Sequence, residues 1–334
     1  MTYNRNENID IIRGFAVVLM VLGHSVAAEN LNDIDSKCCK VVFEYIYTFH
    51  MPLFFIIAGF CYKRCVNYFE YVNKRVKRIL VPYVVFSVVS IILRNIFSVF
   101  TLSKSNIGED VISILFYGAD IWFLYVMFEV SIFFPLIERI VEKNKLKCYV
   151  GLILILIIGF VLRNRGIFLV NNMTYYMLFF LLGYVLKARI EQMLEEKSNV
   201  NKKLQIIIAL ILYTLIGCSV CFEWENANLF FMHIIRVFLA TIGCFASFLL
   251  LKNIELFKIK SILKNIGTYS LPIYIFNGYF ISISRNIIIN CGLKDLIMLF
   301  VLCNFFFGLI INYLFCILIN KIKFVRVILG MTRT

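Results

Sequence analysis

The stretch FHMPLFFIIAGF at residues 49–60 is apolar enough to cross a membrane, yet its second residue is a histidine, His50. The stretch GFAVVLMVLGHS at residues 14–25 has the same character and carries His24 near its end. Polar and ionisable groups are costly inside a bilayer, and where they occur they often mark functional sites. The chain has only three histidines. The placement of two of them in apolar runs therefore indicates a polar site among membrane helices.

The composition is that of a membrane protein. Of the 334 residues, 61% are hydrophobic and the mean hydropathy is +0.87, whereas soluble domains are about 45–50% apolar. Apolar runs of about 20 residues span a hydrocarbon core roughly 30 Å thick. The sequence therefore predicts an all-α, polytopic integral membrane protein with a single transmembrane domain over residues 1–334. About ten transmembrane helices are expected, the first of them uncleaved, at residues 9–28, 43–62, 79–100, 119–137, 148–162, 172–188, 203–221, 230–251, 269–290 and 295–319.

Basic residues give the expected orientation. The net charge is +14, and cationic loops hold their side of a membrane protein in the cytoplasm. With the N-terminus inside, the clusters KRVKR at 74–78 and RIVEKNKLK at 139–147 both lie on the cytoplasmic side. The prediction is N-in and C-in. Membrane orientation accounts for the charge, so no nucleic-acid partner is expected, and the scattered cysteines lack the spacing of a metal site.

The two histidines fall at similar predicted depth. His24 lies about 15 residues along the first helix, roughly 22 Å, and His50 about seven residues into the second, roughly 10 Å from its outer end. They either share a polar cavity or each bond to a neighbouring helix. Arg13 lies on the same helical face as His24, about 16 Å away, and Asp10 is placed to pair with it. That pair either begins a polar stripe facing the bundle interior or is an interfacial ion pair.

Two further motifs lie near the predicted membrane boundaries. Arg75 and Arg78 are spaced i,i+3, on one face of a helix that Pro82 would kink or start. Two guanidinium groups at this spacing suit a phosphate, although anionic lipid headgroups attract the same residues. Asp120 and Trp122 lie at the outer mouth of the predicted fourth helix, where a tryptophan also serves as an interface anchor.

Together these segments resemble acyltransferase family 3 of integral membrane O-acyltransferases, in particular the branch related to fucose 4-O-acetylases. The resemblance covers nearly the whole chain and rests on NIDIIRGFAVVLMVLGHS (8–25), FHMPLFFIIAGF (49–60), KRVKRILVPY (74–83), DIWFLYVMFE (120–129) and IGTYSLPIYIFN (266–277). It implies transfer of an acyl group, usually acetyl, from cytoplasmic acetyl-CoA to a hydroxyl of a cell-surface or lipid-linked sugar. It also implies a multi-pass protein of the bacterial cytoplasmic (inner) membrane, in contact with lipid, with acyl-CoA as co-substrate and no bound cofactor.

The resemblance assigns roles to individual residues. It implies that His24, with Arg13 and His50, is catalytic, and that Arg75 and Arg78 bind the donor. As acceptor-binding or structural residues it implies Asp10, Asp120, Trp122, Tyr125 and Asn277. Many relatives have histidine in place of Asn277, and histidine or glutamine is common in place of Asp120.

The chemistry follows from the imidazole. A sugar hydroxyl needs a general base to attack a thioester, and a neutral imidazole suits that task. His24 would take the hydroxyl proton or accept the acyl group transiently, and His50 would orient it. We expect His24 and the two arginines to border one continuous chamber. A transporter or exporter of a glycan or small solute is the alternative, because intramembrane charges also mark transport pathways; a structural subunit without chemistry is the third possibility.

Overall fold

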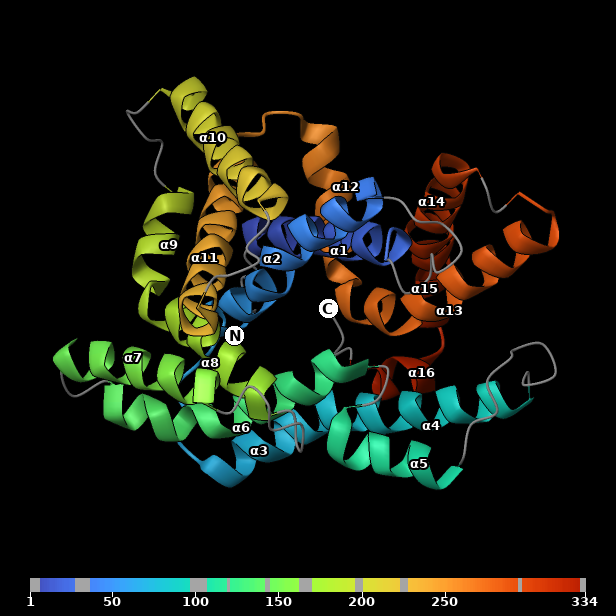
Figure 1. The fold of residues 1–334 in the computed structure, drawn as a ribbon. Coiled ribbons are helices and arrows are strands. Elements are labelled where there is room, and N and C mark those ends of the chain that lie inside the picture. The colour runs from blue at the N-terminus through green and yellow to red at the C-terminus, as the bar shows by residue number, and fades with distance from the viewer. Residues whose placement is uncertain are drawn as a thin grey trace. The chain divides into compact units, whose positions relative to one another are not determined.

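The structure is a computed structural model that describes residues 7–27, 37–96, 107–118, 121–141, 145–161, 170–195, 201–222, 228–293 and 296–330. Within these ranges the regular secondary structure is entirely helical, which confirms the all-α prediction (Figure 1). Contacts divide the chain into two compact units. The first comprises Met1–Ile57 and Leu186–Leu318, and the second comprises Ala58–Val185 and Ile319–Thr334.

The first unit contains the N-terminal helices and most of the C-terminal half. Its elements are α1 (Glu7–Ser25), most of α2 (Lys37–Phe60), α9 (Lys187–Glu195), α10 (Lys202–Cys221), α11 (Leu229–Asn253), α12 (Phe257–Thr268), α13 (Ser270–Asn290), α14 (Ile297–Phe306), the π-helical turn η7 (Phe307–Ile311) and most of α15 (Asn312–Asn320).

The second unit contains the middle of the chain and the last helix. Its elements are α3 (Tyr68–Arg75), the π-helical turn η2 (Val76–Leu80), α4 (Val81–Ile96), α5 (Ile107–Ile112), the π-helical turn η4 (Ser113–Tyr117), α6 (Trp122–Val141), α7 (Lys145–Val161), α8 (Val170–Val185) and α16 (Lys323–Ile328).

Seven helical stretches of the described chain are long and apolar enough to cross a membrane. They are Glu7–Ser25, Lys37–Phe60, Tyr68–Leu93, Gly108–Arg139, Lys202–Cys221, Leu229–Asn253 and Ile297–Ile319. The remaining three predicted spans coincide with α7, α8 and α13, which have 17, 16 and 21 residues. Multiple membrane helices are therefore present, whereas the count of ten and the orientation remain predictions.

In the first unit, α1 and α12 cross at two glycines. A Cβ on Gly14 would overlap the carbonyl oxygen of Leu263, and a Cβ on Gly267 would overlap the carbonyl oxygen of Asp10. α1, in dark blue, and α12, in light orange, lie against each other in Figure 1. Small residues permit such close approach between membrane helices, whose association depends on packing contacts. This crossing fixes the N-terminal part of α1, the helix that carries His24.

Replacing Gly267 with leucine should disrupt this crossing. The added side chain forces α12 away from α1, and overpacking of this kind costs about 1–3 kcal/mol or more. We expect a lower melting temperature and less folded protein on size-exclusion chromatography in detergent. Gly278→Leu in α13 is the matched control, because a Cβ at Gly278 meets no atom within 4 Å. Equal melting temperatures for the two variants would show that the crossing tolerates separation.

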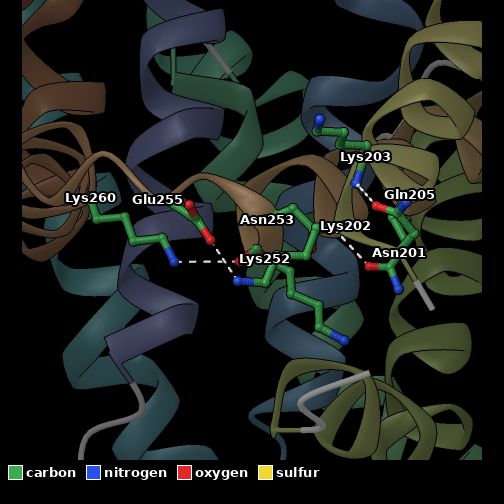
Figure 2. Close-up of polar contacts among 8 residues, drawn as sticks. All are labelled: Asn201, Lys202, Lys203, Gln205, Lys252, Asn253, Glu255 and Lys260. Atoms are coloured by element: carbon green, nitrogen blue, oxygen red, sulfur yellow. Dashed lines mark hydrogen bonds and ion pairs between the residues drawn. The ribbon is translucent and has the colours of Figure 1, made fainter. Parts of the chain in front are cut away.

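A polar network joins the start of α10 to the end of α11 (Figure 2). The Asn253 amide donates to Gln205 Oε1 and to the Leu249 carbonyl, each at 2.8 Å. Lys202 pairs with Glu255 across the same ends at 2.5 Å. Since these side chains come from opposite termini, they fix α10 and α11 as an antiparallel pair.

The second unit is built around a buried carboxylate. The Tyr62 hydroxyl donates to Glu138 Oε2 at 2.7 Å, and the Tyr184 hydroxyl donates to Oε1 at 3.2 Å. The rings of Phe134 and Phe180 pack against Tyr62. Glu138 is 3% exposed, and a buried carboxylate is tolerated only when its oxygens are hydrogen-bonded. This group links α6 and α8 to the segment that follows α2.

Candidate active site

The structure brings His24 and His50 together through a tyrosine on α2. The Tyr47 hydroxyl lies 3.5 Å from His24 Nδ1. The centre of the Tyr47 ring is 4.6 Å from that of His50 and 6.1 Å from that of His24, with edge-to-face geometry in both pairs. The sequence left open a shared polar cavity or separate bonds to neighbouring helices. In the structure the two imidazoles flank one aromatic side chain, and His50 bonds to a carbonyl of its own helix.

The hydrogen bond of His50 identifies its tautomer. His50 Nδ1 lies 2.8 Å from the Ile46 carbonyl oxygen, and a carbonyl oxygen can only accept. Nδ1 therefore carries the proton and donates it to this bond. In the neutral ring, Nε2 then holds the free lone pair, because only one ring nitrogen is protonated.

Small residues on the neighbouring helices allow this arrangement. A Cβ on Gly23 of α1 would lie 2.9 Å from Tyr47 Cε2, and a Cβ on Gly243 of α11 would lie 2.5 Å from Phe49 Cγ. The Cys244 thiol also donates to the Phe49 carbonyl at 3.6 Å. The glycines let α2 approach both helices closely, and the contacts of Phe49 set the rotation at which Tyr47 and His50 face α1.

Arg13 forms the predicted ion pair with Asp10. Arg13 Nη1 donates to Asp10 Oδ1 at 3.3 Å, with the Asp10 side chain 1% exposed and the Arg13 side chain 32% exposed. The pair lies where α1 meets α12, since the backbone of Asp10 is one side of that crossing. It is about 16 Å along α1 from His24. The ion pair therefore lies within α1 beside its crossing with α12, apart from the two imidazoles.

In the second unit, Arg75 and Arg78 belong to different helical segments. Arg75 is the last residue of α3 and its Cζ lies 4.9 Å from the centre of the Tyr71 ring. Arg78 is exposed and lies in the π-helical turn η2. Hydrogen bonds in a π-turn run from i to i+5, so the i,i+3 spacing does not give the single α-helical face that the sequence predicted. The Arg75 guanidinium packs on Tyr71, whereas Arg78 is exposed.

Pro82 explains why the helix widens at this point. Pro82 lies in the first turn of α4, as predicted, and it lacks the N–H that would bond to the carbonyl of Arg78 four residues earlier. Gly330, which has a φ of 65°, lies against that same carbonyl, since a Cβ there would be 2.7 Å from the oxygen. A side chain at Gly330 would both clash with Arg78 and be strained at this φ.

The Trp122 motif holds the neighbouring helices of the second unit. The Trp122 ring, at the start of α6, lies 5.8 Å from the Tyr176 ring of α8. The Tyr125 hydroxyl donates to the Leu115 carbonyl at 3.1 Å, and the Tyr83 hydroxyl donates to the Ile114 carbonyl at 2.6 Å. These contacts attach η4 to α4 and α6. Asp120, the other residue predicted here, lies outside the described residues.

Asn277 is buried in α13 and 3% exposed. Its Oδ1 has no hydrogen-bond partner in the part of the chain that the structure describes. Sequence reasoning singled out Asn277 but missed two other residues, Tyr47 and Asn304. Tyr47 precedes His50 by one helical turn, so the i,i+3 relation was a usable signal. Among the described residues, no group of three His, Cys, Asp or Glu side chains is placed to hold a metal ion.

Comparison with known proteins identifies the class to which this multi-pass helical protein belongs. The sequence profile of the acyltransferase 3 family, described as an acyltransferase domain, matches residues 6–321. The chain therefore belongs to this family, and it is an acyltransferase. The assignment favours an enzyme over a transporter or a structural subunit.

Two relatives are nodulation proteins named NolL. The protein from Sinorhizobium fredii is 30% identical over 82 residues, which are 24% of this chain and 22% of the relative. The protein from Mesorhizobium japonicum is 25% identical over 156 residues, which are 45% of this chain and 39% of the relative. The match thus spans less than half the length of either protein. No solved structure matches the chain.

Proposed function

We propose that this acyltransferase moves an acetyl group from cytoplasmic acetyl-CoA to a hydroxyl group of a cell-surface or lipid-linked sugar. The family assignment supports the reaction class, and the resemblance to the fucose 4-O-acetylase branch supports acetyl and sugar as substrates. We further propose a single catalytic domain of ten transmembrane helices in the bacterial cytoplasmic membrane, with both termini inside. The distribution of lysine and arginine supports this orientation.

The observation that carries the proposal is the His24–Tyr47–His50 group. If His24 Nδ1 donates its proton to the Tyr47 oxygen, its Nε2 holds a lone pair and acts as the general base. Nε2 takes the proton of the sugar hydroxyl, and the hydroxyl oxygen forms a bond to the thioester carbonyl carbon. The carbon–sulfur bond then breaks, and the CoA thiolate leaves and takes up a proton. His50 positions Tyr47, and through it the ring of His24.

The arginines supply donor recognition in this proposal. Arg75 and Arg78 hold the phosphates of CoA, because guanidinium groups bind phosphate through paired, charge-assisted hydrogen bonds. Arg13 acts indirectly: its ion pair with Asp10 lies within α1, the helix that carries His24, beside the crossing of that helix with α12. Trp122 and Tyr125 hold together the helices of the second unit, which carries Arg75 and Arg78. Asp120 contributes hydrogen bonds to the sugar.

A direct assay tests the reaction. Purified protein in liposomes is supplied with acetyl-CoA labelled in the acetyl group and with methyl α-L-fucoside as a probe acceptor. We expect the label to appear on the sugar as an alkali-labile ester, and free CoA to form in equal amount. Label that stays on CoA while the sugar crosses the membrane would identify a transporter instead and overturn the proposal.

A further inference from the structure

Three polar side chains are buried in the first unit, two of them on α13 and one on α14. Asn304 is fully buried, and Asn277 and Ser284 are 3% and 1% exposed. Within the described ranges, four of their side-chain atoms have no hydrogen-bond partner. They are Nδ2 and Oδ1 of Asn304, Oδ1 of Asn277 and Oγ of Ser284. Nearly all buried polar groups in native proteins are paired. These three residues, the α13–α14 polar cluster, therefore have unused hydrogen-bonding capacity inside the protein.

The register of the two helices places the three residues along one stretch of their packing. A Cβ on Gly308 would lie 3.0 Å from Asn277 Oδ1, and Phe300 packs in one apolar cluster with Ile288. The residue numbers run in opposite directions, so the two segments are antiparallel. Asn304 is midway between Gly308 and Phe300. Asn304 therefore lies opposite the middle of the α13 stretch between Asn277 and Ile288. Ser284 lies in that stretch.

The same contacts place the cluster along α1. A Cβ on Gly308 would lie 2.9 Å from Val21 Cγ1, and Val26 belongs to the apolar cluster of Phe300. The α13–α14 polar cluster thus lies beside the part of α1 that runs from Val21 toward Val26. His24 is in that part of α1.

Asn312 shows how the chain satisfies a buried amide when it uses one for structure. Asn312 Nδ2 donates to the Ile273 carbonyl at 2.9 Å and to the Gly308 carbonyl at 3.2 Å, and its Oδ1 accepts from the Cys316 thiol at 3.3 Å. Asn312 is fully buried, as Asn304 is. Asn304, eight residues earlier, has no hydrogen-bond partner at either amide atom among the residues that the structure describes. The two buried asparagines therefore differ in whether the protein itself satisfies their amides.

The backbone next to Asn304 is also irregular. The π-helical turn η7 (Phe307–Ile311) follows α14 directly and interrupts a helix that continues as α15. Such turns are rare and occur frequently at functional sites. Its position beside the polar cluster is a second indication that this stretch is shaped for binding.

We infer that the α13–α14 polar cluster binds hydroxyl groups of the acceptor sugar, an inference that rests on the proposed function. Amide and hydroxyl side chains both donate and accept hydrogen bonds. They therefore suit an uncharged ligand whose polar atoms also both donate and accept. Sugar hydroxyls have this chemistry, and so does water. Asn304 is then a specificity-determining residue that holds the sugar at the level of His24, where a neighbouring hydroxyl reacts.

The test compares Asn304→Leu with the wild-type protein and with Asn312→Leu. For Asn304→Leu we expect the KM for methyl α-L-fucoside to rise roughly 10-fold or more, as loss of hydrogen bonds predicts, with the KM for acetyl-CoA unchanged. Without sugar, its melting temperature should equal or exceed that of the wild type, because an unpaired buried amide is removed. Asn312→Leu should melt lower, because it breaks satisfied hydrogen bonds. Asn304→Ser, which keeps a donor and an acceptor, should give an intermediate KM.

A binding measurement separates this inference from the proposed function. We expect methyl α-L-fucoside to raise the melting temperature of the wild type and not that of Asn304→Leu. This result without acetyl transfer would uphold the sugar site and overturn the proposed reaction. Transfer with an unchanged KM in Asn304→Leu would uphold the reaction and show that the cluster holds water alone. A low melting temperature of sugar-free Asn304→Leu would assign Asn304 a structural role and overturn the inference.

Discussion

Replacing His24 with glutamine is expected to lower the rate of acetyl transfer roughly 10²–10⁴-fold, the usual contribution of a general base. Glutamine occupies a similar volume and can still meet the Tyr47 hydroxyl, but it cannot take a proton. The KM for acetyl-CoA should stay unchanged, because donor recognition is assigned to Arg75 and Arg78. The measurement is the initial rate of label transfer from acetyl-CoA to methyl α-L-fucoside in liposomes, over a range of donor concentrations.

Tyr47→Phe is the matched control for this experiment. It keeps the ring beside His24 and His50 and removes the hydroxyl that lies 3.5 Å from His24 Nδ1. Loss of one modest hydrogen bond corresponds to about a 2–10-fold effect, well below that of His24→Gln. A His24→Gln enzyme that works at the wild-type rate would contradict the assignment of the base. Label recovered on His24 itself, after incubation without a sugar, would show that the acetyl group passes through an acyl-imidazole.

Much of the fold was predictable because apolar runs with polar ends define membrane helices. The predicted spans at 203–221 and 230–251 coincide closely with α10 (Lys202–Cys221) and α11 (Leu229–Asn253). The Asp10–Arg13 pair was predictable for a similar reason, since a helix brings residues three apart together.

Other features depend on packing between helices and were not predictable. Tyr47 precedes His50 by one turn of α2, a relation visible in the sequence, but it meets His24 only because Gly23 lets α2 approach α1 closely, and nothing local to Tyr47 encodes that approach. The unpaired amide of Asn304 cannot be seen in the sequence either, because Asn312, a buried asparagine eight residues further along, has hydrogen bonds to both atoms of its amide. The π-turn at Arg78 has a visible cause in Pro82, yet the proline alone permits a kink, a helix start or a widened turn.

The second large effect is expected on donor binding, from replacing one residue of the Arg75–Arg78 pair. Arg78→Ala is expected to raise the KM for acetyl-CoA roughly 10–100-fold, the equivalent of one charge-assisted hydrogen-bonding group. The KM for the sugar should not change. Arg78→Lys should recover only part of the loss, because lysine keeps the charge but lacks the planar fork that binds phosphate bidentately.

Lys77→Ala decides between donor binding and a general role of the basic cluster. Lys77 is exposed and lies beside Arg78 in η2, so both residues would contribute equally to membrane orientation or to attraction of anionic lipid. If the cluster serves only those purposes, the two alanine variants will have the same small effect on the KM for acetyl-CoA. If Arg78 holds the CoA phosphates, only its replacement raises that KM, and dephospho-CoA will inhibit the wild type less strongly than CoA.

Because Arg75 also packs on Tyr71, Arg75→Ala should lower both donor affinity and melting temperature, whereas Arg78→Ala should lower donor affinity alone.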